Sequence, residues 1–351
     1  MFIGRKNNIA NSAKSGTNNA VFGPHTAYAG ALAPIRELIT DRAGRLRSDW
    51  RTRHRHLALV VEGGALRAIS SAAICQVLSR AGLATVFDSI HAVSMGAAIG
   101  VYFAANSCDR IISALLGPIR EHVLRTPRAL GLVPTRFDIQ SITNKIAYQH
   151  APLDMEYILR YHRQKPINIY AAEVERGKLE ALPFENRREL VSAVSASCNL
   201  PLIQQRPLPH RDKRYYDGGV ITPLPVSKAI EGQATDVLVV LSRPLATLHY
   251  PSKDPLAELG AARAINRFAP NLRAPLKRRL GVFPYINTLL YAAEHPSKNV
   301  ARVNICAIAP TGDRVAETLE TDIGRLLALA HNARHSAERF LRALDLRAQY
   351  C

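Results

Sequence analysis

The strongest constraint on the fold is the alternation of short apolar runs with longer segments of helical spacing. The apolar runs occupy residues 57–64, 87–93, 167–174, 236–242 and 303–310, and the first of them reads LALVVEGG. A continuous apolar run of this length that ends in glycine is typical of a strand buried on both faces. The intervening helical segments would cover both faces of a parallel sheet. The sequence therefore predicts an α/β fold, a three-layer α/β/α sandwich with a mainly parallel central sheet.

The chain has 351 residues, which suits one large domain or two modest ones. We expect residues 1–50 to form a polar and basic N-terminal extension that is partly flexible, although residues 31–46 have helical spacing. Residues 51–351 then form the main domain. Within it, residues 244–299 are basic and contain several prolines, which is compatible with a helical cap over a site or with a peripheral helical excursion. A long amphipathic helix is expected over residues 316–347.

The charge balance restricts the partners that the chain can attract. It has 46 Lys and Arg residues against 28 Asp and Glu residues, a net charge of +18. Such a balance favours polyanions, either nucleic acid or an anionic lipid surface. The densest basic run, residues 41–56, could bind a polyanion, but its composition is equally typical of a solvated linker. No nucleic-acid-binding motif accompanies it. Nucleic acid is therefore the less favoured partner.

Several classes of protein are disfavoured by what the sequence lacks. It has no run of eighteen apolar residues, so no transmembrane segment is expected, and the first residues lack the apolar region of a secretory signal. The five cysteines are scattered and form no CxxC pair, so neither a zinc site nor a disulfide framework is expected. A reduced, cytoplasmic setting without a metal or a cofactor is the simplest interpretation.

Three short motifs stand out, and the first two lie at the ends of expected strands. EGGALRAI, residues 62–69, would expose backbone N–H groups at a helix start, where they can bind negative charge. AVSMG, residues 92–96, puts a serine between small residues, as a sharp strand-to-helix turn requires. YYDGG, residues 215–219, holds a carboxylate at a tight bend. Each motif alone is also typical of an ordinary turn. Because parallel strands end at one edge of a sheet, we expect Ser94, Asp217 and the glycine loop to converge.

In this order the three motifs resemble the patatin-like phospholipase family, whose pattern is G-G-G-x-[RK]-G, then G-x-S-x-G, then D-G-[GA]. Residues 191–203, VSAVSASCNLPLI, resemble the family's Ala-Ser-x-x-x-Pro segment, and the similarity extends over about residues 57–340. The resemblance implies a patatin-like fold in which Ser94 is the nucleophile and Asp217 is its partner in a Ser–Asp dyad.

The resemblance also assigns the residues around the dyad. The loop that would hold an oxyanion corresponds to Gly63, Gly64 and Ala65, and Arg67 matches the basic residue of that motif. The other supporting motif positions are Ala92, Gly96, Gly218 and Gly219. Alanine stands where the family has glycine at positions 65, 68 and 92, which is the smallest possible change. At position 65 a Cβ penalises the positive φ angles that such a loop uses.

The activity that the resemblance implies is that of a serine esterase acting on the carboxylic ester bonds of lipids, of the phospholipase A or lysophospholipase type. It would proceed through an acyl-enzyme and need no cofactor. Its substrate would be a lipid or another acyl ester, met on an anionic membrane surface to which a cytoplasmic protein binds peripherally. The acyl chain would need an apolar channel, for which Met95, Leu66 and Leu200 are candidates, although core packing explains each of them equally well.

Two alternatives remain open at this point. A hydrolase with a Ser-Asp-His triad would draw its base from the histidines that follow Asp217, which are His249, His295, His331 and His335. A catalytically weak or inactive lipid-surface binding module on the same fold would explain both the alanine positions and the positive charge.

Overall fold

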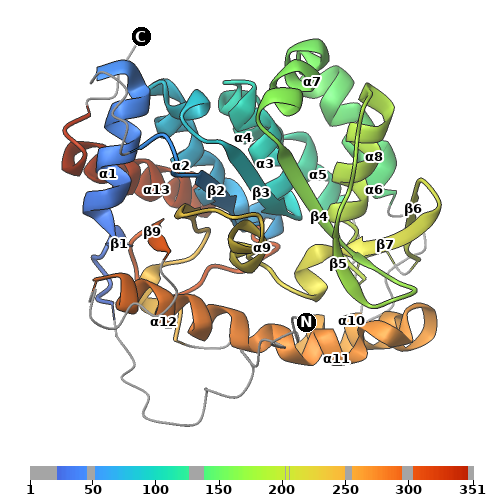
Figure 1. Ribbon diagram of the computed structural model, residues 1–351. Coiled ribbons are helices and arrows are strands. Elements are labelled where there is room, and N and C mark those ends of the chain that lie inside the picture. The colour runs from blue at the N-terminus through green and yellow to red at the C-terminus, as the bar shows by residue number, and fades with distance from the viewer. Residues whose placement is uncertain are drawn as a thin grey trace, which may run out of the picture.

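A nine-stranded sheet forms the centre of the protein (Figure 1). The computed structural model describes residues 22–45, 52–125, 138–201, 203–204, 206–249, 255–294 and 303–346, with the backbone alone at 45, 255–260 and 280. The strand order is β1-β9-β8-β2-β3-β4-β7-β6, and β5 pairs with β4. The strands are β1 (Tyr28–Gly30), β2 (Leu57–Val61), β3 (Ser89–Val93), β4 (Ile167–Glu173), β5 (Lys178–Ala181), β6 (Leu208–His210), β7 (Lys213–Asp217), β8 (Asp236–Val240) and β9 (Asn304–Ile308).

The five predicted strands are all present, and they run parallel to one another as β9, β8, β2, β3 and β4. Every residue of β2, β3 and β8 is buried, as expected for strands covered on both faces. The predicted mainly parallel sheet is thereby confirmed. Four of the five strands end earlier than the apolar runs suggested, and β3 ends at Val93 as expected. After Val61, for example, the chain leaves the sheet and residues 62–64 form a loop.

Helices cover both faces of the sheet and complete the three layers. They are α1 (Leu32–Thr40), α2 (Ile69–Arg80), α3 (Met95–Ala104), α4 (Cys108–Leu116), α5 (Pro118–Arg125), α6 (Ile139–Lys145), α7 (Met155–Gln164), α8 (Arg187–Ser197), α9 (Val226–Glu231), α10 (Pro255–Phe268), α11 (Arg273–Arg278), α12 (Val282–Glu294) and α13 (Ile323–Ala343). In the described residues no helix is both long and apolar enough to cross a membrane.

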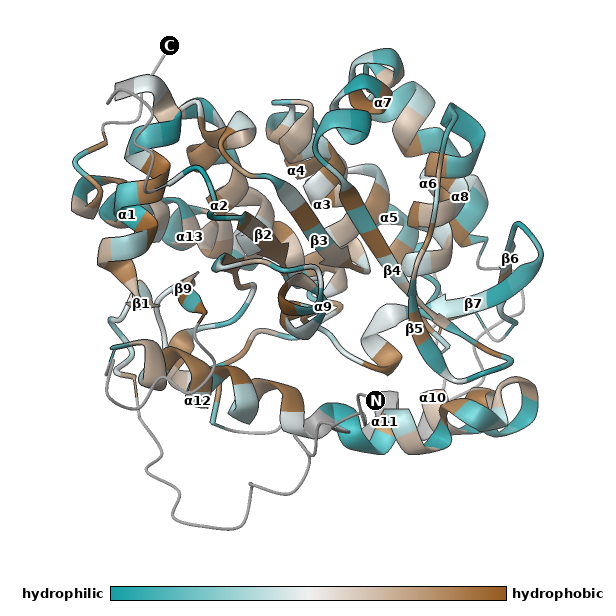
Figure 2. Cartoon of the chain, in the orientation of Figure 1, coloured by the Kyte–Doolittle hydropathy of each residue, from teal (hydrophilic) through white to brown (hydrophobic). Residues whose placement is uncertain are grey.

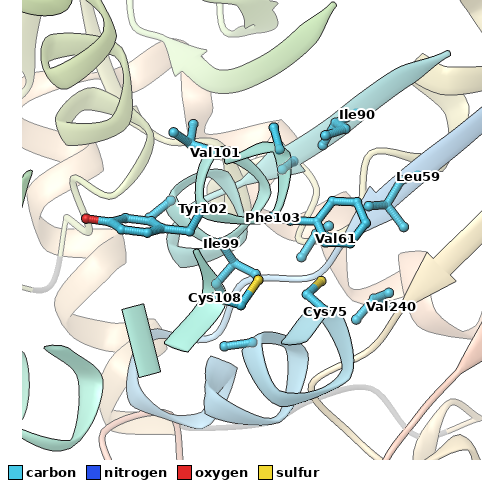
Figure 3. Packing of buried hydrophobic residues seen from close by; sticks show 14 of the residues in the cluster. Leu59, Val61, Cys75, Ile90, Ile99, Val101, Tyr102, Phe103, Cys108 and Val240 are labelled. Carbon is cyan, nitrogen blue, oxygen red and sulfur yellow. The ribbon is translucent and has the colours of Figure 1, made fainter. Parts of the chain in front are cut away.

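Two apolar clusters lie on opposite faces of the sheet. The larger cluster joins α1, α2, α3, α4, α8 and α13 to Leu57, Leu59 and Val61 of β2. The smaller one joins α9 and α12 to the alternate residues of the same strand, Ala58 and Val60. Figure 3 shows Phe103 of α3 directed toward Leu59 and Val61, and Figure 2 shows apolar residues concentrated on the strands, with hydrophilic residues on the outer helix surfaces. The residues of β2 thus alternate between the two clusters, because successive side chains of a strand point to opposite faces of the sheet.

The expected boundary at residue 50 is wrong for part of the N-terminal segment. Strand β1 pairs antiparallel with β9, and Ile35, Leu38 and Ile39 of α1 are fully buried in the larger cluster. Residues 28–40 therefore belong to the folded domain. The flexibility expected for the first 21 residues falls outside the described part of the chain.

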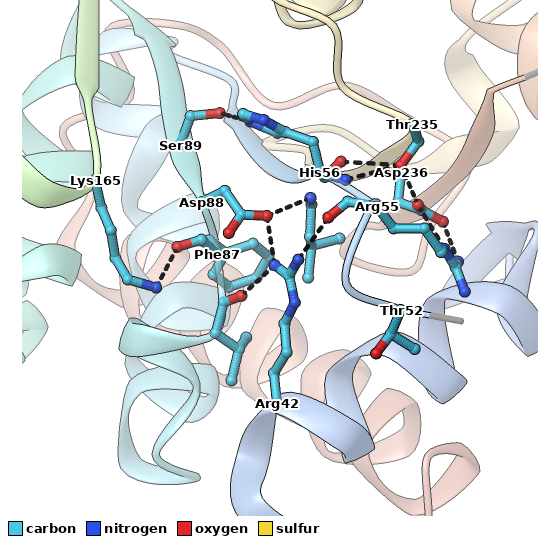
Figure 4. Close-up of polar contacts among 12 residues, drawn as sticks. Arg42, Thr52, Arg55, His56, Phe87, Asp88, Ser89, Lys165, Thr235 and Asp236 are labelled. Carbon is cyan, nitrogen blue, oxygen red and sulfur yellow. Dashed lines mark hydrogen bonds and ion pairs between the residues drawn. The ribbon is translucent and has the colours of Figure 1, made fainter. Parts of the chain in front are cut away.

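Ion pairs hold the N-terminal segment to the amino ends of the strands (Figure 4). Arg55 donates through Nε to Asp236 at 2.9 Å and through Nη1 to Glu37 at 2.9 Å. Arg42 forms an ion pair with Asp88 and donates to the Val86 carbonyl at 2.9 Å. The described part of the basic run thus contains structural arginines with carboxylate partners, which differs from the solvated linker that its composition suggested.

The segment 244–299, for which a cap and a peripheral excursion were both open, is mainly helical where it is described. Helices α10 to α12 run along one side of the molecule, at the bottom of Figure 1. Ile265, Ala269 and Leu272 pack in a third apolar cluster with Tyr216 and Val220, which flank the Asp217 turn. The segment therefore lies beside the third motif. The helix predicted from residue 316 begins only at Ile323, because the Asp322 side chain accepts the Arg325 amide as its N-cap.

Candidate active site

Ser94 occupies a sharp turn between β3 and α3. Its backbone angles are φ 58° and ψ −140°, a conformation that non-glycine residues rarely adopt. The turn brings α3 close to β2, so that a Cβ atom placed on Gly96 would lie 2.5 Å from the Val61 carbonyl oxygen. Ala92, on the other side of the serine, is fully buried but fits its single methyl group. The backbone therefore requires glycine at 96 and tolerates alanine at 92.

Asp217 ends β7, and its carboxylate reaches Ser94. Ser94 Oγ donates a hydrogen bond to Asp217 Oδ2 at 2.6 Å, and the Gly219 amide donates to Oδ1 at 2.7 Å. A Cβ on Gly218 would lie 2.8 Å from the Tyr170 carbonyl oxygen, so the turn passes tightly against β4. The two residues predicted to converge are thus in direct contact although they lie 123 positions apart.

The environment of Asp217 makes it a stronger base than an exposed carboxylate. The side chain is 1% exposed. Burial raises the pKa of Asp217 from 3.8 to about 6, while the hydrogen bonds from Ser94 and Gly219 and the charge of Arg279 oppose that rise. A carboxylate with such a pKa is ionised at neutral pH and accepts a proton more readily than an ordinary aspartate.

The glycine loop lies directly against Ser94. A Cβ on Gly63 would come within 2.8 Å of Ser94 Cβ, and Gly64 has a φ of 132° that glycine alone adopts readily. Ala65 follows with a φ of 48°, so alanine does reach the positive angle that the loop needs. The amides of residues 63–65 donate no hydrogen bond to another described residue. They are therefore available to a negatively charged oxygen beside Ser94.

Arg67 turns into a buried polar network behind this loop. The Glu62 carboxylate accepts the Ser242 amide at 2.7 Å and Arg243 Nε at 3.0 Å, and it lies 3.6 Å from Arg67 Nη2. Burial, with a contribution from the charge of Arg243, lowers the pKa of Arg67 to about 10, and Glu62 opposes the shift. The Thr318 carbonyl accepts the Arg67 amide at 3.4 Å. Arg67 thus ties the loop to the segment before α13.

Two further buried residues, Ser197 and Asn199, hold the site together, and neither was predicted from the sequence as a site residue. Ser197 Oγ accepts the Ser94 amide at 2.8 Å and donates to the Tyr170 carbonyl at 2.7 Å. The Asn199 carbonyl accepts the Asp217 amide at 2.9 Å. Both residues lie in the VSAVSASCNLPLI segment, whose run of small polar residues before a proline was the available signal. They fix the backbones of Ser94 and Asp217 relative to β4.

No histidine that the structure describes is hydrogen-bonded to the Ser94–Asp217 pair. His331 and His335 lie on α13, where His335 is 3.8 Å from Glu338, and His295 falls outside the described residues. No group of three or more His, Cys, Asp or Glu side chains in the described part of the chain is arranged to hold a metal ion.

The comparison with protein families agrees with the order of the motifs. Residues 59–230 match the family described as Patatin-like phospholipase, a range that contains Ser94, Asp217 and the glycine loop. None of the curated proteins searched matches the chain. Lipid acyl hydrolysis is the activity of this family in general. The family match and the mainly parallel sheet between helical layers together show that residues 59–230 form a patatin-like phospholipase domain.

Proposed function

We propose that the chain is a lipid acyl hydrolase in which Ser94 and Asp217 form a catalytic dyad. The observation that carries the proposal is the 2.6 Å hydrogen bond from Ser94 Oγ to a buried carboxylate. It joins a serine in a strained turn to a base whose pKa is raised to about 6. A nucleophile within hydrogen-bond reach of its base, beside free amides, is the arrangement that acyl transfer needs.

The reaction would proceed in two halves. Ser94 Oγ attacks the ester carbonyl carbon while its proton passes to Asp217, and the carbonyl electrons move onto the oxygen, which the amides of residues 63–65 hold. The tetrahedral intermediate then expels the alcohol, which takes the proton from Asp217, and leaves an acyl-enzyme. Water attacks that ester with Asp217 as the base, and collapse of the second intermediate returns the proton to Ser94 and releases the acid.

A fluorophosphonate probe tests for the nucleophile directly. The wild-type chain should be labelled, and Ser94→Ala should not, whereas Ser113→Ala should be labelled like the wild type because Ser113 is exposed on α4. Asp217→Asn should lose most of the hydrolysis of a soluble ester, by about a hundredfold or more. Labelling of Ser94→Ala at the wild-type rate would end the proposal.

The triad alternative is tested by replacing the histidines. His249→Ala, His331→Ala and His335→Ala should each retain ester hydrolysis within a few-fold of the wild type, because the proposed base is Asp217. His295→Ala completes the series. Loss of turnover in one of them, with the fold intact, would favour a triad instead.

The alternative of an inactive binding module makes the opposite prediction for the same probe. It predicts no labelling of the wild type together with retained binding to lipid vesicles. We propose that the active enzyme also meets its substrate at an anionic membrane surface, because the net charge of +18 favours such a surface. The phospholipase A or lysophospholipase type of activity is tested by lipid profiling after incubation with wild type and Ser94→Ala.

A further inference from the structure

An apolar cavity extends along α3 on the side away from the sheet, and its wall includes Met95, the residue after Ser94. Nearly all of its walls are hydrocarbon, and they come from α3, α4, α5, α6, α8 and the segment around Leu153. On α3 they are Met95, Ala98, Val101 and Tyr102, which share one face of the helix because they are spaced by three, three and one residues. Figure 3 shows Tyr102 pointing away from Phe103, which packs toward the sheet.

Two residues of the cavity wall are chain neighbours of residues at the Ser94 turn. Met95 directly follows Ser94 in the chain, and Cys198 directly follows Ser197, whose Oγ accepts the Ser94 amide at 2.8 Å. Of the three residues considered for an acyl channel from the sequence, Met95 lines this cavity, while Leu66 is fully buried in the larger apolar cluster and Leu200 is not part of the cavity wall.

The few polar groups in the wall are not arranged to bind a polar ligand. The Tyr102 hydroxyl donates to the Ala151 carbonyl at 2.6 Å, and Thr143 Oγ1 donates to the Ile139 carbonyl at 2.8 Å. Burial lowers the pKa of His122, so its ring is neutral at physiological pH. An apolar cavity with its polar groups already satisfied stays dry and accepts hydrocarbon.

The extent of the cavity along α3 and its volume both indicate how much hydrocarbon fits. Along α3, the cavity runs from Met95 to Tyr102, which at the rise of a helix is about 10 Å, the length of an extended chain of about eight carbons. The volume open to the centre of a water-sized sphere is about 80 Å³. Roughly 10–15 Å³ of that measure is needed per water-sized group, so roughly five to eight methylene-sized groups fit.

We propose that this cavity binds the acyl chain of the substrate and makes the enzyme selective for medium-chain esters, with acyl groups of about six to ten carbons. The inference rests on the proposed function, since it places the ester carbonyl at Ser94 and the chain along α3. Ala98 lies on the wall between Met95 and Tyr102, and Ile142 of α6 lies on another wall. The side chains of Ala98 and Ile142 set how much of the acyl chain fits in the cavity.

The test is hydrolysis of p-nitrophenyl esters of straight-chain acids, from acetate through octanoate to palmitate, below their critical micelle concentrations. Each methylene buried in the cavity should raise kcat/KM about fourfold. The rise should stop near octanoate and reverse for laurate and palmitate. A series that is flat, or that rises without a break to palmitate, would overturn the inference. Hydrolysis of none of the esters, with no fluorophosphonate labelling, would count against the proposed function instead.

Two variants of the wall sharpen the test. Ala98→Leu fills the cavity beside Met95 and should lower the ratio of octanoate to acetate hydrolysis at least about tenfold. Ala274→Leu adds the same side chain at an exposed position on α11 and should leave that ratio at the wild-type value. An unchanged ratio in a labelled Ala98→Leu protein contradicts the inference. If Ala98→Leu fails to fold, Ile142→Ala decides, because it enlarges the cavity and should move the optimum to longer chains.

Discussion

At the scale of single residues, the base of the proposed dyad sets the pH dependence of activity. Asp217 must be ionised to accept the Ser94 proton, and burial raises its pKa to about 6. We expect kcat/KM for a soluble ester to rise with pH through a midpoint near 6 and then to stay level until other groups titrate. A pH series of initial rates measures this, with the labelling rate of the fluorophosphonate as a second readout. A midpoint near 4 would indicate a base that is exposed to solvent.

The same residue links stability to pH. The pKa of Asp217 is higher in the folded chain than in the unfolded one, so the folded state binds its proton more tightly. The resulting stabilisation is complete below the unfolded pKa, near 3.8, and is lost as the pH rises through about 6. Asp217→Asn has no carboxylate to ionise at this position, so it does not lose this stabilisation as the pH rises. Its free energy of unfolding, relative to the wild type, should therefore increase by about 2–3 kcal/mol between pH 3 and pH 8.

Denaturant titrations at several pH values measure that difference, provided that both proteins are folded across the range. Glu231→Gln, at the exposed end of α9, is a suitable control because Glu231 pairs with Lys228 at the surface. The control should show no comparable change with pH. A constant difference between wild type and Asp217→Asn would mean that the carboxylate is less buried than its 1% exposure implies.

At the scale of elements, the close approach of α3 to β2 is what presents the serine. A Cβ on Gly96 would lie 2.5 Å from the Val61 carbonyl oxygen and 3.0 Å from the Gly63 nitrogen. Gly96→Ala should therefore push α3 away from β2, lower the free energy of unfolding by about 1–3 kcal/mol and abolish labelling of Ser94. Thermal unfolding and probe labelling measure the two effects.

The matched change is Ala92→Gly, two residues on the other side of the serine. It removes one buried methyl group and restores the residue usual in the family, so labelling should persist while stability falls by about 1 kcal/mol. If Gly96→Ala were labelled and folded as well as Ala92→Gly, the turn would have to adapt to a side chain at position 96.

The sequence predicted the elements whose signal is local. The parallel strands are continuous apolar runs, so residues 63–65 and Ser94 could be placed at strand ends, whereas Asp217 was placed only in a tight turn. Strand β1 was missed because its three residues carry no period of their own and are held only by pairing with β9. Ser197 was missed as a support of Ser94 for a similar reason. Its hydrogen bond spans 103 positions, and no local pattern records such a contact.

At the scale of the whole molecule, a group of exposed basic residues lies on the helices that flank the Asp217 turn. Arg263 and Arg267 of α10 and Arg273, Lys277 and Arg278 of α11 are all exposed. Arg279 follows them and donates to the Gly219 carbonyl at 3.5 Å, which connects this basic surface to the turn itself. An anionic membrane bound there would lie beside the proposed site.

We therefore expect the protein to bind vesicles that contain anionic lipid more tightly than zwitterionic vesicles, and to lose that preference as salt rises and shortens the screening length. Reversing three charges on α11, Arg273→Glu, Lys277→Glu and Arg278→Glu, should weaken binding to anionic vesicles by about a hundredfold, at about 1 kcal/mol per basic residue. Vesicle sedimentation at low and high salt measures both effects.

The control reverses three exposed arginines away from the site, Arg160 and Arg163 of α7 and Arg188 of α8. Helix α7 lies at the opposite end of the molecule from α11 (Figure 1). Both triple variants have the same net charge, so a purely non-specific attraction would weaken equally in the two. A larger loss for the α11 variant, together with unchanged hydrolysis of a soluble ester, would assign membrane binding to the surface beside Asp217. Equal losses would make it a property of the net charge of +18 alone.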